Sequence, residues 1–285
     1  MVDPKRRASE NVEGAWFVDT TCIACDACRQ CAPTIFREHR DGSSSVMRQP
    51  RSDDDKADAT RALLACPVGA IGKERMAGEG PVKITGLYPH ALEPGLWYCG
   101  YNSPKSYGGN AYVVETHAGL VMIDAPRFVA NVVDFITAHG GLRAILLTHG
   151  DDIGDSDRYA ERFGAPVYLH EADAPRAPFA SSSWPRALAD DVTLLETPGH
   201  TRGSVMFAVR DLLFTGDSLA WSRDAQRLMA FDDACWYSWS EQRRSLANLV
   251  ARDVRFRFVL PGHGQRHATS ADDNRRLLQD LVARM

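Results

Sequence analysis

The chain has 285 residues, of which 44% are hydrophobic and 25% are charged, so there is room for one large and one small globular domain. A net charge of −4 without a cluster of Lys and Arg residues disfavours a nucleic-acid partner. The opening residues lack the apolar segment of a signal peptide, and no later run approaches ~20 apolar residues. We therefore expect no membrane partner, and the cytoplasm is the expected location.

Five of the seven cysteines fall in the first quarter of the chain, at positions 22, 25, 28, 31 and 66. Cysteines three residues apart are a poor match for disulfide geometry. In a reducing compartment such spacing is more typical of metal binding.

Cys22, Cys25 and Cys28 are separated by two-residue gaps, and the remote Cys66 is followed directly by Pro67. A cubane cluster presents four irons, so a tight loop can reach three of them while another segment supplies the fourth ligand. Residues 13–75 resemble bacterial-type single-cluster ferredoxins, which implies a ferredoxin-like domain with one [4Fe–4S] cluster. Zinc also accepts four thiolates and is the alternative, but the Cys-Pro-Val-Gly-Ala-Ile context favours iron and sulfide.

Cys31 follows Cys28 after a further two-residue gap. In two-cluster ferredoxins a fourth cysteine ligates the other cluster, and this sequence has no second cysteine run, so we interpret Cys31 as a surplus thiol. The polar residues 37–58 predict a solvated loop before a helix that leads to Cys66. Gly and Pro accumulate over 72–83 and predict a boundary there, giving domains 1–80 and 81–285.

From about residue 82 onward, short apolar runs alternate with helical patterns, which predicts sheets flanked by helices in an α/β (α+β) fold. Ser270 and Asp273 form a helix-start signal. The expected helices cover 127–138, 155–163, 239–252 and 270–284. The expected strands cover 110–115, 119–124, 143–149, 166–170, 191–199, 204–210, 212–217 and 255–263.

Four of these strands end in a residue that can bind a metal: His149, His200, Asp217 and His263. Three of the four lie in glycine-containing turns. Residues so far apart in sequence converge only if a sheet brings the strand ends together, so the pattern predicts a preformed metal site.

The motifs THGDDIGDSD, GHTRGS, TGDS and PGHG resemble those of the metallo-β-lactamase superfamily, and the likeness covers about residues 84–270. Asn110 and Asp124 lie in segments that are similar to the opening strands of that family. The resemblance implies an αββα sandwich with a dinuclear metal site at one edge. It also implies that His149, His200 and His263 are ligands and that Asp217 bridges two metals.

The first motif departs from the usual His-x-His-x-Asp-His pattern of the family. Asp151 takes the place of the second histidine, and the later aspartate is either Asp152 or, with two inserted residues, Asp155. We favour Asp155 as this ligand. The carboxylate in the second position resembles the flavodiiron branch of the superfamily, which binds two irons. Three imidazoles with two or three carboxylates also favour iron or manganese over zinc.

The resemblance predicts a metal-dependent hydrolase acting on an ester, thioester or related bond of a small molecule. The metal would lower the pKa of a bound water towards ~7, and Asp155 would be the catalytic residue that orients this water or accepts its proton. One alternative is a di-iron oxidoreductase that receives electrons from the fused cluster and from a redox partner protein. Another is a non-catalytic redox or oxygen sensor with a degenerate metal site. The expected cofactors are the [4Fe–4S] cluster and one or two ions of iron, zinc or manganese.

Overall fold

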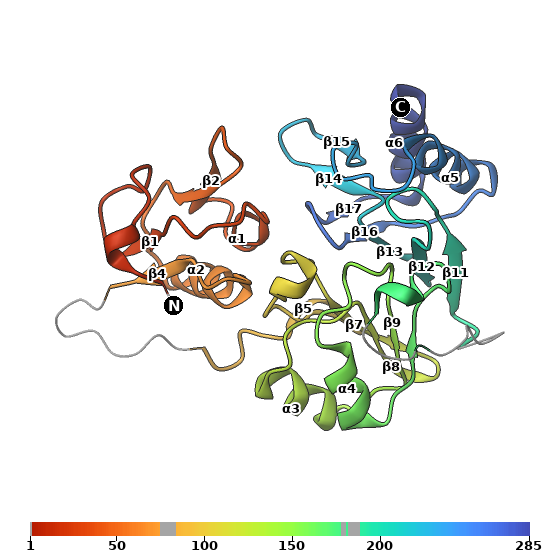
Figure 1. Cartoon of the computed structure of the whole chain (residues 1–285), viewed down its shortest axis with the longest axis horizontal. Helices are drawn as coiled ribbons and strands as arrows, with labels where there is room; N and C mark the ends of the chain where they lie inside the picture. The colour runs from red at the N-terminus through yellow and green to blue at the C-terminus, as the bar shows by residue number, and fades with distance from the viewer. Residues whose placement is uncertain (1, 75–83, 178–180, 182–188) are drawn as a thin grey trace.

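The computed structural model of the chain describes residues 2–74, 84–177, 181 and 189–285. It forms a small N-terminal domain, drawn in red and orange, beside a larger domain of two sheets and four helices (Figure 1). The boundary that we predicted between residues 80 and 81 lies outside the described residues.

The N-terminal domain consists of two short β-ribbons and two helices. Strand β1 pairs with β4 and β2 pairs with β3, both antiparallel. Its elements are η1 (Pro4–Arg6), β1 (Trp16–Val18), α1 (Ala27–Cys31), β2 (Phe36–Glu38), β3 (Ser44–Val46), α2 (Asp53–Ala65) and β4 (Ile71–Lys73).

The solvated loop predicted over 37–58 was wrong in its first half, because β2 and β3 form a hairpin there. The Asp41-Gly42 turn closes this hairpin, with Gly42 at φ 80° and the Gly42 amide donating to the His39 carbonyl. The predicted helix before Cys66 is present as α2. It begins after Ser52, whose hydroxyl and the Asp55 carboxylate form a reciprocal capping box.

The first sheet of the larger domain has six strands in the order β10-β9-β8-β7-β6-β5. Strands β8, β9 and β10 run parallel, and α3 and α4 make the connections between them. Its elements are β5 (His90–Glu93), β6 (Leu96–Tyr98), η2 (Pro104–Ser106), β7 (Tyr112–Thr116), β8 (Gly119–Ile123), α3 (Ala130–Ala138), β9 (Ala144–Leu146), α4 (Ser156–Phe163), β10 (Val167–Tyr168) and η3 (Ala174–Arg176).

The second sheet has five strands in the order β11-β12-β13-β16-β17, and a separate hairpin of β14 and β15 lies beside it. Strands β13 and β16 are parallel neighbours, so their C-terminal ends meet at one edge. Its elements are β11 (Val192–Glu196), β12 (Val205–Val209), β13 (Leu212–Gly216), β14 (Ala220–Ser222), β15 (Arg227–Met229), α5 (Trp239–Ala251), β16 (Phe258–Pro261), β17 (His267–Ala268) and α6 (Ala271–Arg284).

Alternating residues of the second sheet divide between two cores. Phe207 and Phe214 face the first sheet, where Phe214 makes an edge-on contact with Tyr112 at 5.5 Å between ring centroids. Met206 and Leu213 face the opposite way and join the buried cluster of α5 and α6. The result is an αββα sandwich, which confirms the predicted fold class and all four predicted helices of this domain.

The two domains are in direct contact through hydrogen bonds and buried apolar side chains. Arg127 of the larger domain donates to the Leu64 carbonyl at 2.8 Å, and the Tyr88 hydroxyl donates to the Arg61 carbonyl at 3.1 Å. Ala65 of α2 is buried in the same apolar cluster as the first sheet. No helix among the described residues has the length and apolar character needed to cross a membrane.

Candidate metal centres

Four cysteines of the N-terminal domain line one small cavity: Cys22, Cys25, Cys28 and Cys66. Two come from the loop before α1, one from α1 itself and one from the end of α2. Burial raises the pKa of the Cys25 thiol to about 12 and that of Cys28 well above its ordinary value. Buried thiols that face one another lose their protons only when a cation compensates the charge, so this group fits an iron–sulfur cluster.

Cys31 does not line the part of this cavity that the structure describes. Its Sγ lies 3.2 Å from the hydroxyl of Tyr88, at the contact between the two domains. Burial raises the pKa of its thiol. The arrangement is consistent with our interpretation of Cys31 as a surplus thiol.

The predicted ligands of the larger domain all follow strands at one edge of the sandwich. His149 lies just after β9, His200 in the turn from β11 to β12, Asp217 after β13 and His263 after β16. The fold thus brings together residues that are far apart in the sequence.

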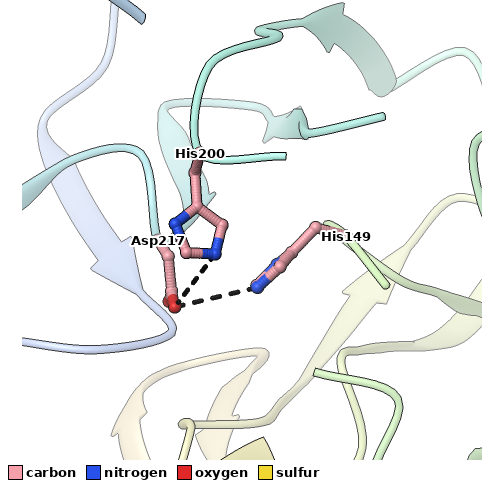
Figure 2. A group of neighbouring side chains, drawn as sticks. All are labelled: His149, His200 and Asp217. Atoms are coloured by element: carbon pink, nitrogen blue, oxygen red, sulfur yellow. Dashed lines mark ion pairs between the residues drawn. The ribbon is translucent and has the colours of Figure 1, made fainter. Parts of the chain in front are cut away.

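Asp217 is the common point of this group. Its Oδ2 lies 3.7 Å from Nε2 of both His149 and His200 and 3.9 Å from Nε2 of His263. Figure 2 shows the first two of these ion pairs as dashed lines. The rings of His149 and His200 are edge-on at 4.7 Å between centroids. Both imidazoles therefore present a nitrogen towards the same carboxylate.

Several of these donor atoms are buried and have no hydrogen-bond partner. They are Nε2 of His149 and His200, Oδ1 of Asp217, and Oδ2 of Asp151 and Asp152. Buried polar atoms are almost always paired, and five unpaired donor atoms that converge on one point are the pattern of a cation-binding site. The residues present fit a metal site.

The donors form two overlapping groups. One consists of His149, His200 and Asp217, and the other of Asp152, Asp217 and His263. Within each group the donor atoms lie within 4.8 Å of one another. Asp217 belongs to both, so its carboxylate could hold an ion at either position.

Among the described residues, Asp155, which we favoured from the sequence, belongs to neither group. Its Oδ1 accepts from Lys105 Nζ at 2.7 Å and its Oδ2 from the Phe128 amide at 2.8 Å, so both oxygens are engaged elsewhere. Asp152 takes the expected place instead. Two glycines, Gly109 and Gly262, pack closely against the Asp152 carboxylate. A methyl group at either glycine would lie 2.6 Å from a carboxylate oxygen.

Asp151, the other departure from the family motif, lies beside the first group. Its Oδ2 is 3.6 Å from His200 Nε2, and its Oδ1 pairs with Arg176 at 2.7 Å. One oxygen is thus directed to the metal side and the other is held by a cation, which fixes the orientation of the carboxylate.

Two further aspartates, which we did not predict as ligands, hold the metal-binding loops in place. Asp173 accepts from the amides of Gly150 and Gly203 and from the Thr201 hydroxyl, so it ties the His149 turn to the His200 turn. Asp124 accepts from Thr148, whose hydroxyl lies 3.0 Å from His149 Nδ1. Such outer partners set the tautomer and direction of a ligating histidine.

The electrostatics of the site favour a bound cation. Burial lowers the pKa of His149 to about 4, which keeps the imidazole neutral and able to ligate. Burial opposes charge on Asp217, but the three facing histidines hold the pKa of its carboxyl below the ordinary value. Burial and the nearby Asp217 raise the pKa of Asp152 well above its ordinary value. A divalent metal would replace protons at this crowded group of carboxylates.

A cleft of about 1370 Å³ opens over the metal site and is lined by both domains. Its walls include Cys25, Arg37 and Met47 from one domain, and Tyr107, Asp217 and His263 from the other. The cluster region therefore forms part of the entrance to the metal site.

Two consecutive glycines separate the two centres. A methyl group at Gly108 would lie 3.0 Å from Cys25 Sγ, and one at Gly109 would lie 2.6 Å from Asp152 Oδ1. Since successive Cα atoms are about 3.8 Å apart, Cys25 Sγ and Asp152 Oδ1 are no more than roughly 13 Å apart.

Comparison with known proteins agrees with this architecture. Residues 18–73 match the family "4Fe-4S single cluster domain of Ferredoxin I". An uncharacterized protein of Mycobacterium tuberculosis is 30% identical over 206 residues, covering 57% of this chain and 89% of the relative. A hydroxyacylglutathione hydrolase of Cereibacter sphaeroides is 36% identical over 107 residues, covering 34% of this chain and 42% of the relative.

Among solved structures, TTHA1623 in a di-iron-bound form is similar, with 25% identity and a TM-score of 0.49 over 67% of this chain and 98% of that one. The chain belongs to the family of the mycobacterial protein and carries an N-terminal single-cluster [4Fe–4S] domain. The larger domain has the αββα sandwich of the metallo-β-lactamase fold.

Proposed function

We propose that the chain is an oxidoreductase in which the [4Fe–4S] cluster passes single electrons to a dinuclear iron centre that acts on a small molecule. The main support for this proposal is the pair of consecutive glycines, Gly108 and Gly109, that lies between the two centres. One glycine packs against the cluster ligand Cys25, and the next packs against Asp152 of the metal site. Hydrolysis requires no electrons, so this close placement of a cluster would serve no purpose in a simple hydrolase.

The donor set supports iron. Three imidazoles and three carboxylates surround the two positions, and no cysteine lies among the described groups of the larger domain. Oxygen-rich sites of this kind suit iron or manganese better than a nitrogen-rich zinc pocket would. In this proposal one metal binds to His149, Asp151 and His200, and the other to Asp152 and His263. Such a ligand set resembles that of the flavodiiron branch.

The residues of the chain would then have distinct roles. When bound, the metal pair supplies a site where a small molecule can take up electrons. Asp217 holds both positions together, Asp173 and Asp124 fix the ligand loops, and the cleft orients the substrate and limits water. The cytoplasm is the expected location, and an external one-electron donor protein is the expected partner.

A metal-dependent hydrolase is the second candidate, and one observation favours it. The hydroxyacylglutathione hydrolase relative matches 34% of this chain at 36% identity. Zinc at the same ligands would support hydrolysis of a thioester or a related bond. The sensor alternative is weaker, because every donor position of both groups is occupied by a ligating residue type.

The test is the metal and sulfide content of protein purified without oxygen. Iron in both centres predicts about six irons and about four sulfides per chain. Cys66→Ala should remove the cluster iron and sulfide and leave about two irons. Zinc beside four irons, together with turnover of a hydroxyacyl thioester, would instead establish the hydrolase. Four irons with an empty second site would support the sensor.

A further inference from the structure

The segment 102–110, here called the bridging loop, is anchored to both centres at once. Asn110 donates through its amide to the Gly262 carbonyl beside His263, and through its side chain to Gln30 of α1. The Asn102 side chain donates to the Gly108 carbonyl at 2.6 Å, which fixes the turn from within. The loop therefore has a single defined path between the cluster domain and the metal site.

Tyr107 is the unusual residue of this loop. Its backbone has φ 48°, a left-handed conformation that is unfavourable for a residue with a Cβ. Its side chain is 58% exposed, so core packing does not hold it there. The phenol donates to the carbonyl of Ile23, which lies between Cys22 and Cys25, and the ring lies 6.3 Å from that of His263.

We propose that the bridging loop is the electron route between the two centres, with Tyr107 as its positioning residue. This inference rests on the proposed function. The tyrosine joins the cluster-binding loop to a metal-ligating imidazole, and a strained, exposed residue with contacts to two sites is expected where function maintains it. One electron lost by the cluster equals one gained at the metal pair, no bond forms or breaks, and an external one-electron donor resupplies the cluster.

The experiment measures transfer inside the intact, metal-loaded protein. The cluster is reduced with dithionite in a stopped-flow cell without oxygen. Freeze-quenched samples enriched in ⁵⁷Fe are then followed by Mössbauer spectroscopy, which separates the cluster from the metal pair. The variants are Tyr107→Ala and Tyr107→Phe. Tyr237→Ala is the matched control, because Tyr237 is a similarly exposed tyrosine (50%) whose side chain the route does not use.

We expect Tyr107→Ala to slow reduction of the metal pair by about tenfold or more, at an unchanged cluster potential and metal content. Tyr107→Phe, which loses only the hydrogen bond to Ile23, should slow it by about threefold. The Tyr237→Ala variant should transfer at the parent rate.

Two failures can be told apart. If the parent protein takes up about three electrons per chain, one in the cluster and two in the metal pair, and Tyr107→Ala transfers at the parent rate, the route is wrong and the proposed function stands. If the parent takes up only one electron, the proposed function fails and the route fails with it. A changed cluster potential in both Tyr107 variants would also overturn the route, because Tyr107 would then act on the cluster itself.

Discussion

The cluster region and the metal-pair region assemble their ligands in opposite ways. Three of the four cluster cysteines come from seven consecutive residues, whereas the metal-pair donors come from four turns spread over more than a hundred residues. The first group needs only a local loop and one remote cysteine. The second exists only when both sheets are folded.

The two regions therefore differ in how far their stability depends on bound metal. The N-terminal domain has a small core of its own, and domains of about 60 residues are marginal without a staple. The metal-pair ligands stand on a sandwich with two large buried clusters. We therefore expect the cluster to stabilise its own domain, and the sandwich to fold whether or not the metal pair is bound.

The largest expected effect follows from removing a cluster ligand. Cys28→Ser should abolish the cluster and unfold much of the N-terminal domain, because cluster binding supplies folding free energy to a small domain. Limited proteolysis should cut residues 2–74 while the sandwich survives. Cys31→Ser is the control and should keep iron, sulfide and resistance to proteolysis. Equal loss of the cluster in both variants would contradict the ligand set.

Asp217→Asn should remove both ions of the metal pair and leave the cluster intact. The amide offers a weaker ligand atom to two positions that share this one side chain. Metal analysis should give about four irons per chain instead of about six, with sulfide unchanged. Retention of one ion at full occupancy would show that Asp217 does not bridge.

Asp152→Asn and Asp155→Asn form a matched pair that separates our two interpretations of the first motif. The Asp152 variant should lose about one ion per chain, because Asp152 is a donor in the second group. The Asp155 variant should keep both ions and lose only an ion pair with Lys105, worth about 1 kcal/mol or less. The opposite pattern of metal loss would restore Asp155 as the ligand.

A smaller effect is expected from Asp173→Ala. This change leaves two buried amides and a hydroxyl without an acceptor, which should lower the free energy of unfolding by about 2–4 kcal/mol. Urea denaturation of the metal-free protein measures it. Asp190→Ala, which removes an exposed partner of His117, should change stability by less than about 0.5 kcal/mol. Similar values for the two variants would show that Asp173 does not organise the loops.

The two regions also differ in which of their features could be predicted from the sequence. The cysteine spacing and the four strand-end residues were sufficient to predict both centres, because local spacing and strand ends are visible in the sequence. The choice between Asp152 and Asp155 was not, because it depends on the path of the turn after His149. Close backbone at Gly109 and Gly262 leaves room for the Asp152 carboxylate, and nothing in the motif itself signals this contact.

The contact between the two domains could not be predicted from the sequence either. Tyr107 and Gly108 carry no recognisable motif, and their importance comes only from their contacts with Ile23 and Cys25. The hairpin of β2 and β3 had a local signal in Asp41-Gly42, which the high polarity of the segment obscured.

The electron paramagnetic relaxation of the reduced cluster shows whether the cluster and the metal pair are neighbours. We expect fast relaxation and a broadened signal when the neighbouring metal pair is paramagnetic, and slow relaxation in Asp217→Asn, which should lack that pair. Identical relaxation in the two proteins, with the pair shown to be present and paramagnetic in the parent, would contradict this placement.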